Sequence, residues 1–276
     1  MKALRRFVRA LWVAFDRFNN NDGWAMAGYI AFTGLLSLFP FLIFAATLVG
    51  IMLGSERSDS VIEALFEIAP EHVALTLQPV VEEVLNKQSG EVLTLSALFA
   101  IWVASNAVES FRIAFDRAYA VPDPRGFFEN RAMAILLVFL GAIVAALLGV
   151  SILFSPLILR FLETVFLFRV PVVASYLTYA FGVLVFIGFV LIMHRMLPGR
   201  RMKTMRLWPG VLVTAVLWVA FASAFSTYLS FTPTYTVTYG TLAGVIITLM
   251  FFYLTGATII FGAELNAALN RVGTDR

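Results

Sequence analysis

Long apolar runs, separated by short polar segments, recur along the whole 276-residue sequence. A membrane-spanning helix needs about 20 mostly apolar residues, and six segments of the chain meet this requirement. They are residues 27–53, 92–108, 132–157, 171–194, 207–230 and 240–264. The pattern therefore predicts an all-α, polytopic integral membrane protein with six transmembrane helices, forming a single membrane domain over residues 1–276.

Two stretches outside these spans have amphipathic patterns. In residues 3–19, apolar side chains recur at helical spacing, opposite a basic set made of Arg5, Arg6, Arg9 and Arg17. Two interpretations fit this helix: it lies in the cytoplasmic interface near anionic headgroups, or it packs on the inner ends of the spans. Residues 54–91 alternate apolar and acidic positions, and we expect them to form short helices on the outer face.

The second span, residues 92–108, is the least apolar of the six and runs directly into charged positions. We expect it to continue as an amphipathic helix that carries Phe111, Phe115 and Tyr119 into water. The sequence VPDPRG at residues 121–126 should then end this helix, because proline and glycine interrupt helical structure.

Composition indicates that lipid is the solvent for most side chains. The chain is 61% hydrophobic and 13% charged, whereas soluble domains have about 45–50% apolar and 25% charged residues.

The chain contains no cysteine, so it can form neither disulfides nor thiolate metal sites. His72 and His194 are predicted on opposite sides of the membrane, and no common nucleotide- or metal-binding motif occurs. The sequence therefore predicts no catalytic, cofactor-binding or metal site, and a protein that is not an enzyme.

The distribution of positive charge predicts the orientation. Sixteen of the 20 Lys and Arg residues fall in the N-terminal segment, the loops after the second and fourth spans, and the C-terminal tail. Because cytoplasmic loops are enriched in these residues, we expect both termini in the cytoplasm. Topology thus explains the basic loops without a nucleic acid partner, and the expected partners are the bilayer and its anionic headgroups.

Pro40 interrupts the first span at a point where lipid cannot replace the lost backbone hydrogen bond. Thr33 and Ser37 precede it by about two turns and one turn, where their hydroxyls are placed to help satisfy the freed carbonyl. The pattern fits either a tolerated kink or a broken helix facing a polar cavity, as in transporters.

Polar residues in the second span form another candidate group, made of Trp102, Ser105, Asn106, Glu109 and Arg112. Asn106 should hydrogen-bond to another helix, and the three-residue spacing of Glu109 and Arg112 allows a local ion pair. These side chains either hold helices together or line a path. The spacing of Gly240 and Gly244, with Gly262 further along, favours close helix packing and is compatible with a homo-oligomer.

Glu264 is the first charged residue after an uncharged run over residues 207–263. An acid near a helix C-terminus is unfavourable, so we expect a compensating cation from Arg112, Arg131 or Arg206, with Asn266 hydrogen-bonding nearby. The pair would be either a structural clasp or an inner gate.

Five motifs together resemble the YihY/BrkB family of bacterial inner-membrane proteins. They are SLFP at 37–40, WVASNAVESFR at 102–112, WPG at 208–210, YGTLAGVI at 239–246 and GAELNA at 262–267. Val211 stands where the family usually has Ala, and residues 251–253 stand where a Trp is common. The resemblance implies six helices, cytoplasmic termini and an inner-membrane location.

Members of that family have been linked to serum resistance and envelope lipid traffic, and have carried a ribonuclease label that this sequence does not support. The leading hypothesis is a transporter or flippase-like protein for a lipidic or amphipathic envelope compound. The alternative is a non-transporting envelope scaffold that affects envelope integrity or serum resistance, and a membrane-bound hydrolase comes third.

Overall fold

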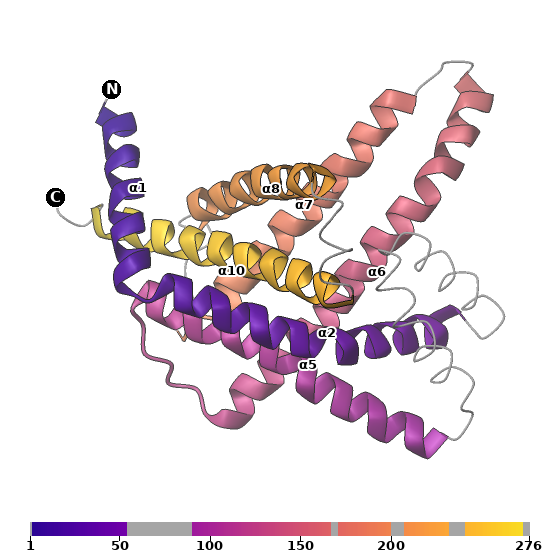
Figure 1. Ribbon diagram of the computed structural model, residues 1–276, viewed down its shortest axis with the longest axis horizontal. Helices are drawn as coiled ribbons and strands as arrows, with labels where there is room; N and C mark the ends of the chain where they lie inside the picture. The colour runs from indigo at the N-terminus through magenta and orange to yellow at the C-terminus, as the bar shows by residue number, and fades with distance from the viewer. Residues whose placement is uncertain (1, 54–89, 167–170, 200–206, 232–240, 273–276) are drawn as a thin grey trace. The chain divides into compact units, whose positions relative to one another are not determined.

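The computed structural model describes residues 2–53, 90–166, 171–199, 207–231 and 241–272 (Figure 1), and within these ranges all regular structure is α-helical. The helices are α1 (Lys2–Asn20), α2 (Gly23–Leu53), α5 (Gly90–Tyr119), α6 (Phe127–Phe166), α7 (Pro171–Met196), α8 (Trp208–Phe231) and α10 (Thr241–Val272). The all-α prediction is confirmed. Helix α1 overlaps the predicted amphipathic segment, and the six long helices overlap the ranges predicted as spans. Of the predicted outer amphipathic segment, residues 54–91, the part 54–89 lies outside the described residues.

In the part of the chain that the structure describes, four helical stretches are long and apolar enough to cross a membrane: Leu98–Tyr119, Phe127–Ala145, Trp208–Leu229 and Ala243–Arg271. Gly23–Leu38 and Ala180–Met196 are shorter apolar helices within the described residues. Large apolar side chains such as Phe99, Leu184 and Val216 are about two-thirds exposed, as expected for faces that meet lipid. The chain is therefore a multi-pass membrane protein, and the count of six spans and the cytoplasmic side of the termini stay predictions.

Contacts divide the chain into two compact units. One comprises residues 1–38, 102–137 and 190–276, and the other comprises residues 39–101 and 138–189. In the first unit α10 packs against both α1 and α8, and Figure 1 shows α1 lying across the C-terminal end of α10. Helix α1 and the C-terminal part of α10 thus lie together at one end of this unit.

Helix α1 packs through one face and exposes another. Ala10 and Ala14 are fully buried against Leu265 and Ala268 of α10. On a different face Val8, Trp12 and Phe15 are 46%, 72% and 49% exposed. The interpretation that α1 packs on the ends of the spans is confirmed, and its exposed apolar stripe remains free for the predicted contact with the interface.

The end of α5 is buried, contrary to the expectation that it extends into water. Phe115 and Tyr119 are 0% and 7% exposed, and both rings contact the imidazole of His194 in α7. The charged positions that suggested a solvated helix are instead satisfied within the protein. The predicted break is confirmed, since α5 ends at Tyr119 and α6 begins only at Phe127.

Helix α2 stays helical through Pro40, which agrees with a tolerated kink rather than a broken helix. Thr33 and Ser37 do not act as expected on the carbonyl that Pro40 frees. The Ser37 hydroxyl donates to the Val103 carbonyl oxygen of α5 at 3.0 Å, and the Thr33 hydroxyl lies 3.0 Å from that of Ser110. Both side chains therefore join α2 to α5.

Candidate functional site

Glu264 forms the centre of a buried polar contact between helices distant in sequence. Its side chain is 0% exposed, and its Oε2 atom lies 2.7 Å from Nε of Arg17. The side-chain amide of Asn21 donates to its other carboxylate oxygen. Arg17 also donates through Nη2 to the Ala118 carbonyl oxygen of α5 at 2.6 Å. We call these four residues the Glu264 clasp, which joins α10, α5 and the end of α1.

The prediction that a cation lies beside Glu264 is confirmed, but the cation is Arg17 rather than either of the two predicted arginines that the structure describes. Arg112 and Arg131 bind other side chains, and Arg206 lies outside the described residues. The sequence pattern places Arg17 in the basic set of α1, opposite its apolar side chains. Arg17 follows Ala10 and Ala14 by seven and three positions, so it shares their packed face. This spacing indicates that Arg17 faces the protein, but it does not identify Glu264 as its partner.

Asn266 bonds to α8 and α5 rather than to Glu264. Its Oδ1 accepts a hydrogen bond from the Gly210 backbone N–H at 2.7 Å. Its Nδ2 donates to the Leu207 carbonyl oxygen at 3.0 Å and to the Tyr119 hydroxyl at 3.4 Å. This fully buried amide therefore supplies partners for the first turn of α8, where backbone N–H groups have no helical acceptor.

Tyr119 extends this network to His194, which is 0% exposed in α7. The Tyr119 hydroxyl lies 2.7 Å from Nδ1 of His194. Nε2 has no hydrogen-bond partner among the described side chains, and the ring packs on Phe115 with centroids 4.5 Å apart.

Two glycines allow α8 and α10 to touch at backbone distance. A Cβ atom on Gly210 would overlap the carbonyl oxygen of Gly262 and the side chain of Asn266, and one on Gly262 would overlap the Thr214 hydroxyl. Close packing at Gly262 agrees with its predicted role. At Gly244 a Cβ would meet no atom of the described residues within 4 Å, so none of these residues approaches it closely. Gly240 lies outside the described residues.

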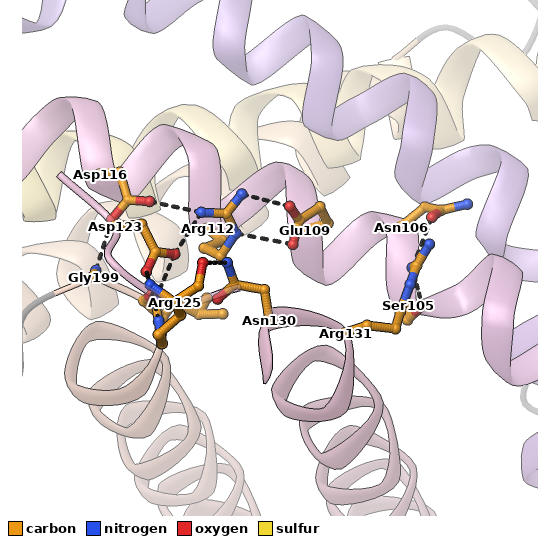
Figure 2. A network of polar contacts seen from close by, with 11 residues as sticks. Ser105, Asn106, Glu109, Arg112, Asp116, Asp123, Arg125, Asn130, Arg131 and Gly199 are labelled. Atoms are coloured by element: carbon orange, nitrogen blue, oxygen red, sulfur yellow. Dashed lines mark hydrogen bonds and ion pairs between the residues drawn. The ribbon is translucent and has the colours of Figure 1, made fainter. Parts of the chain in front are cut away.

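Arg112 is held by three carboxylates (Figure 2). Its Nη1 lies 2.9 Å from Asp116 and 2.7 Å from Asp123, and its Nε lies 2.9 Å from Glu109. The expected local pair with Glu109 is confirmed, and Asp116, four positions after Arg112 in the same helix, also pairs with it. Asp123 was not expected, because it lies beyond the helix end, where helical spacing predicts nothing.

The loop after α5 is tied to the end of α7 by the same network. Arg125 pairs with Asp123 at 2.8 Å and donates to the carbonyl oxygens of Met196 and Leu197. The Gly199 backbone N–H donates to Asp116 at 2.8 Å, as Figure 2 also shows. This network fixes two inter-span connections against each other.

The pH dependence of this connection is testable at Asp123, which lies between α5 and α6. Burial alone would raise its pKa, but hydrogen bonds from the side chain and backbone of Arg125 outweigh burial and lower it to about 2. A depressed pKa contributes stability that is complete above the unfolded-state value of about 3.9 and is lost toward pH 2. The wild type should therefore have a larger free energy of unfolding than Asp123→Asn at pH 6. This difference should shrink between pH 4 and pH 2. An unchanged difference at pH 2 would contradict this assignment.

Ser105 and Asn106 meet α6 through Arg131 (Figure 2). Nη1 of Arg131 donates to Oδ1 of Asn106 at 3.0 Å and to the Ser105 hydroxyl. The guanidinium also lies over the Trp102 ring, 3.8 Å from its centroid. The prediction that Asn106 forms a hydrogen bond with another helix is confirmed, and its amide oxygen is the acceptor.

The described polar groups fasten helices together, and among them no group of three or more His, Asp or Glu side chains is placed to hold a metal ion. Ser37, Ser105, Glu264 and Asn266 are all at least 96% buried. Any path that reaches them requires the helices around them to separate.

The sequence matches the family described as virulence factor BrkB over residues 14–276. It is 28% identical over 263 residues to the "putative ribonuclease-like protein YfkH" of Bacillus subtilis, covering 93% of this chain and 94% of that one. Two proteins named "UPF0761 membrane protein" are each 24% identical. The one from Pseudoalteromonas translucida is matched over 88% of this chain and 80% of its own length, and the one from Idiomarina loihiensis over 92% and 88%. No solved structure matches.

Proposed function

The chain belongs to the virulence factor BrkB family of multi-pass membrane proteins, and from this premise we propose that it is a transporter or flippase-like protein for a lipidic or amphipathic envelope compound in the bacterial inner membrane. The observation that carries the proposal is the Glu264 clasp. A fully buried carboxylate in an apolar helix is held by Arg17 of α1, an amphipathic helix that is not among the four apolar candidate spans of the described residues. Ionisable residues inside membranes are costly and commonly functional.

The clasp has the properties of an inner gate in its closed state. Helix α1 contributes the cation, and its outer stripe of Val8, Trp12 and Phe15 is exposed. Separating Arg17 from Glu264 and from the Ala118 carbonyl would loosen α1 from both α10 and α5. The buried hydroxyl and amide groups behind it would then become accessible to an amphipathic substrate.

The alternative is a non-transporting scaffold, and one observation favours it. The side chains around Glu264 and Asn266 are closely packed, with Ala263, Leu265 and Ala268 all fully buried. Under this alternative the clasp is only structural, and the exposed stripe of α1 contacts a partner or lipid.

The ribonuclease-like name belongs to a relative. We propose that this chain is not an enzyme. The proposal would be contradicted if the purified protein degraded RNA faster than mock-purified membranes do.

Reconstituted protein can separate transport from scaffolding. We expect liposomes with the wild-type protein to move a fluorescent phospholipid analogue between leaflets, measured with an impermeant quencher. Arg17→Gln should accelerate this movement several-fold if the clasp is a gate. The matched control is Arg117→Gln, because Arg117 is half-exposed and pairs only loosely with Asp22 at 3.4 Å.

The outcomes differ clearly between the two functions. Movement equal to that in protein-free vesicles, for both wild type and Arg17→Gln, would exclude transport of this lipid class and favour the scaffold. If the wild type moves the lipid and Arg17→Gln moves it at the same rate, the protein is a transporter and the Glu264 clasp is only a structural contact.

A further inference from the structure

Arg131 differs from the other partly buried arginines of the described chain in the partners it has. Arg17, Arg112 and Arg125 each form an ion pair with a carboxylate. The described partners of Arg131 are instead the Ser105 hydroxyl, the Asn106 amide oxygen and the Trp102 ring. These groups are neutral, whereas a guanidinium is always charged. Among these described contacts, nothing neutralises its charge.

The position of Arg131 makes this charge expensive. It is partly buried four residues into the apolar helical stretch Phe127–Ala145, and a charged side chain that is removed from water is normally paired. The contact with Trp102 offsets part of the cost, because a cation is attracted to the face of an indole ring. A ring supplies no counter-charge, so an anion from outside the described chain would complete the site.

The guanidinium presents one free edge for such an anion. Both described hydrogen bonds of Arg131 start from Nη1, and Figure 2 shows the side chain reaching from the start of α6 to Ser105 and Asn106. The N–H groups of Nε and Nη2 take no part in these bonds. They form the paired donors that bind phosphate oxygens in bidentate geometry.

The surroundings of this edge are apolar and exposed. Trp102, Phe127 and Phe128 are 45%, 62% and 84% exposed, and the Phe127 ring centroid lies 5.9 Å from the guanidinium carbon. Aromatic side chains of this kind gather at the level of lipid headgroups. A free phosphate ion would leave these rings in contact with water, whereas the glycerol and acyl parts of a lipid would cover them.

We propose that Arg131, Trp102, Ser105, Asn106 and Phe127 form a binding site for an anionic phospholipid, with its phosphate on Nε and Nη2 of Arg131 and its apolar part against the aromatic rings. Ser105 and Asn106 orient the guanidinium by fixing Nη1. The site requires no transport activity, so it stands or falls separately from the proposed function.

Lipid binding to the purified full-length protein tests this site. Phosphatidylglycerol is titrated in detergent and bound molecules are counted by native mass spectrometry, with phosphatidylcholine as the zwitterionic comparison. We expect phosphatidylglycerol to bind more tightly than phosphatidylcholine, and Arg131→Gln to weaken phosphatidylglycerol binding about tenfold. Arg131→Lys keeps the charge and loses the paired donors. Its affinity for phosphatidylglycerol should lie between those of the wild type and Arg131→Gln. Comparing each variant with wild type cancels the contribution of the exposed arginines of α1.

Two further variants keep the test decisive if Arg131→Gln does not fold. Phe127→Ala removes an exposed ring and should weaken phosphatidylglycerol binding several-fold with little effect on thermal unfolding. Arg117→Gln, on the same helix as Trp102 but in an ion pair, should bind like wild type. Equal affinity of wild type, Arg131→Lys and Phe127→Ala would overturn the proposal. So would displacement of the lipid by glycerol phosphate alone, which would indicate a site for a free anion.

Discussion

Arg17→Met is expected to lower the free energy of unfolding by about 3–5 kcal/mol, because it leaves the carboxylate of Glu264 buried without a cation. Glu264 is 0% exposed and the Arg17 side chain is 14% exposed, so water cannot replace the lost partner. The substitution also removes the donor to the Ala118 carbonyl oxygen. Methionine retains most of the apolar length of the side chain, so the loss is mainly electrostatic.

The double variant Arg17→Met/Glu264→Gln isolates the ion pair. Glutamine still accepts the hydrogen bond from Asn21 but carries no charge, so we expect this variant to recover much of the loss. Denaturant unfolding in mild detergent provides the free energies. Arg9→Gln is the matched control, because Arg9 is an exposed arginine of the same helix, and it should change stability by less than about 0.5 kcal/mol. Equal stability of Arg17→Met and Arg9→Gln would show that the clasp does not hold the fold.

Stability and lipid movement together decide what the clasp does. A gate requires that Arg17→Met destabilises the contact and that Arg17→Gln speeds movement of the lipid. A purely structural clasp requires the first result without the second. The free energy of unfolding and the rate of lipid movement therefore distinguish an inner gate at Glu264 from a structural clasp.

The helices were predictable because their signal is local. Each span is a continuous apolar run, and the amphipathic period of α1 and the prolines of residues 121–126 are equally visible in a short window. The error at the end of α5 has the same origin. Glu109, Arg112 and Asp116 look like a solvated face when read alone, yet Asp123, Arg125 and the end of α7 satisfy them.

The polar partners were harder to predict because they come from distant segments. Nothing near Glu264 in sequence indicates Arg17, which is 247 positions away, and nothing near Tyr119 indicates His194 or Asn266. Sequence reasoning correctly required a cation for Glu264 and an interhelical partner for Asn106, since buried polar groups need partners. It could not choose among several arginines at similar depth, because that choice depends on how the helices pack.

Gly210→Ala is expected to be the most damaging change of a single methyl group. A Cβ atom at this position would overlap the Gly262 carbonyl oxygen, which is backbone and cannot move aside as a flexible side chain does. Overpacking typically costs about 1–3 kcal/mol, occasionally more. Here α8 would also move from Asn266, and the 2.7 Å bond from the Gly210 N–H would be lost. We therefore expect a loss of about 3 kcal/mol.

Gly244→Ala is the control, since the same methyl group in α10 meets no atom of the described residues within 4 Å. It should leave stability unchanged or raise it by up to about 1 kcal/mol, because alanine is the better helix former. Unfolding in mild detergent measures both variants, and size-exclusion chromatography shows whether each stays folded. Similar stability of Gly210→Ala and Gly244→Ala would mean that α8 and α10 are further apart than the backbone contact at Gly262 requires. In that case Asn266, which depends on this approach to reach both Gly210 and Leu207, would lose the partners that make its burial favourable.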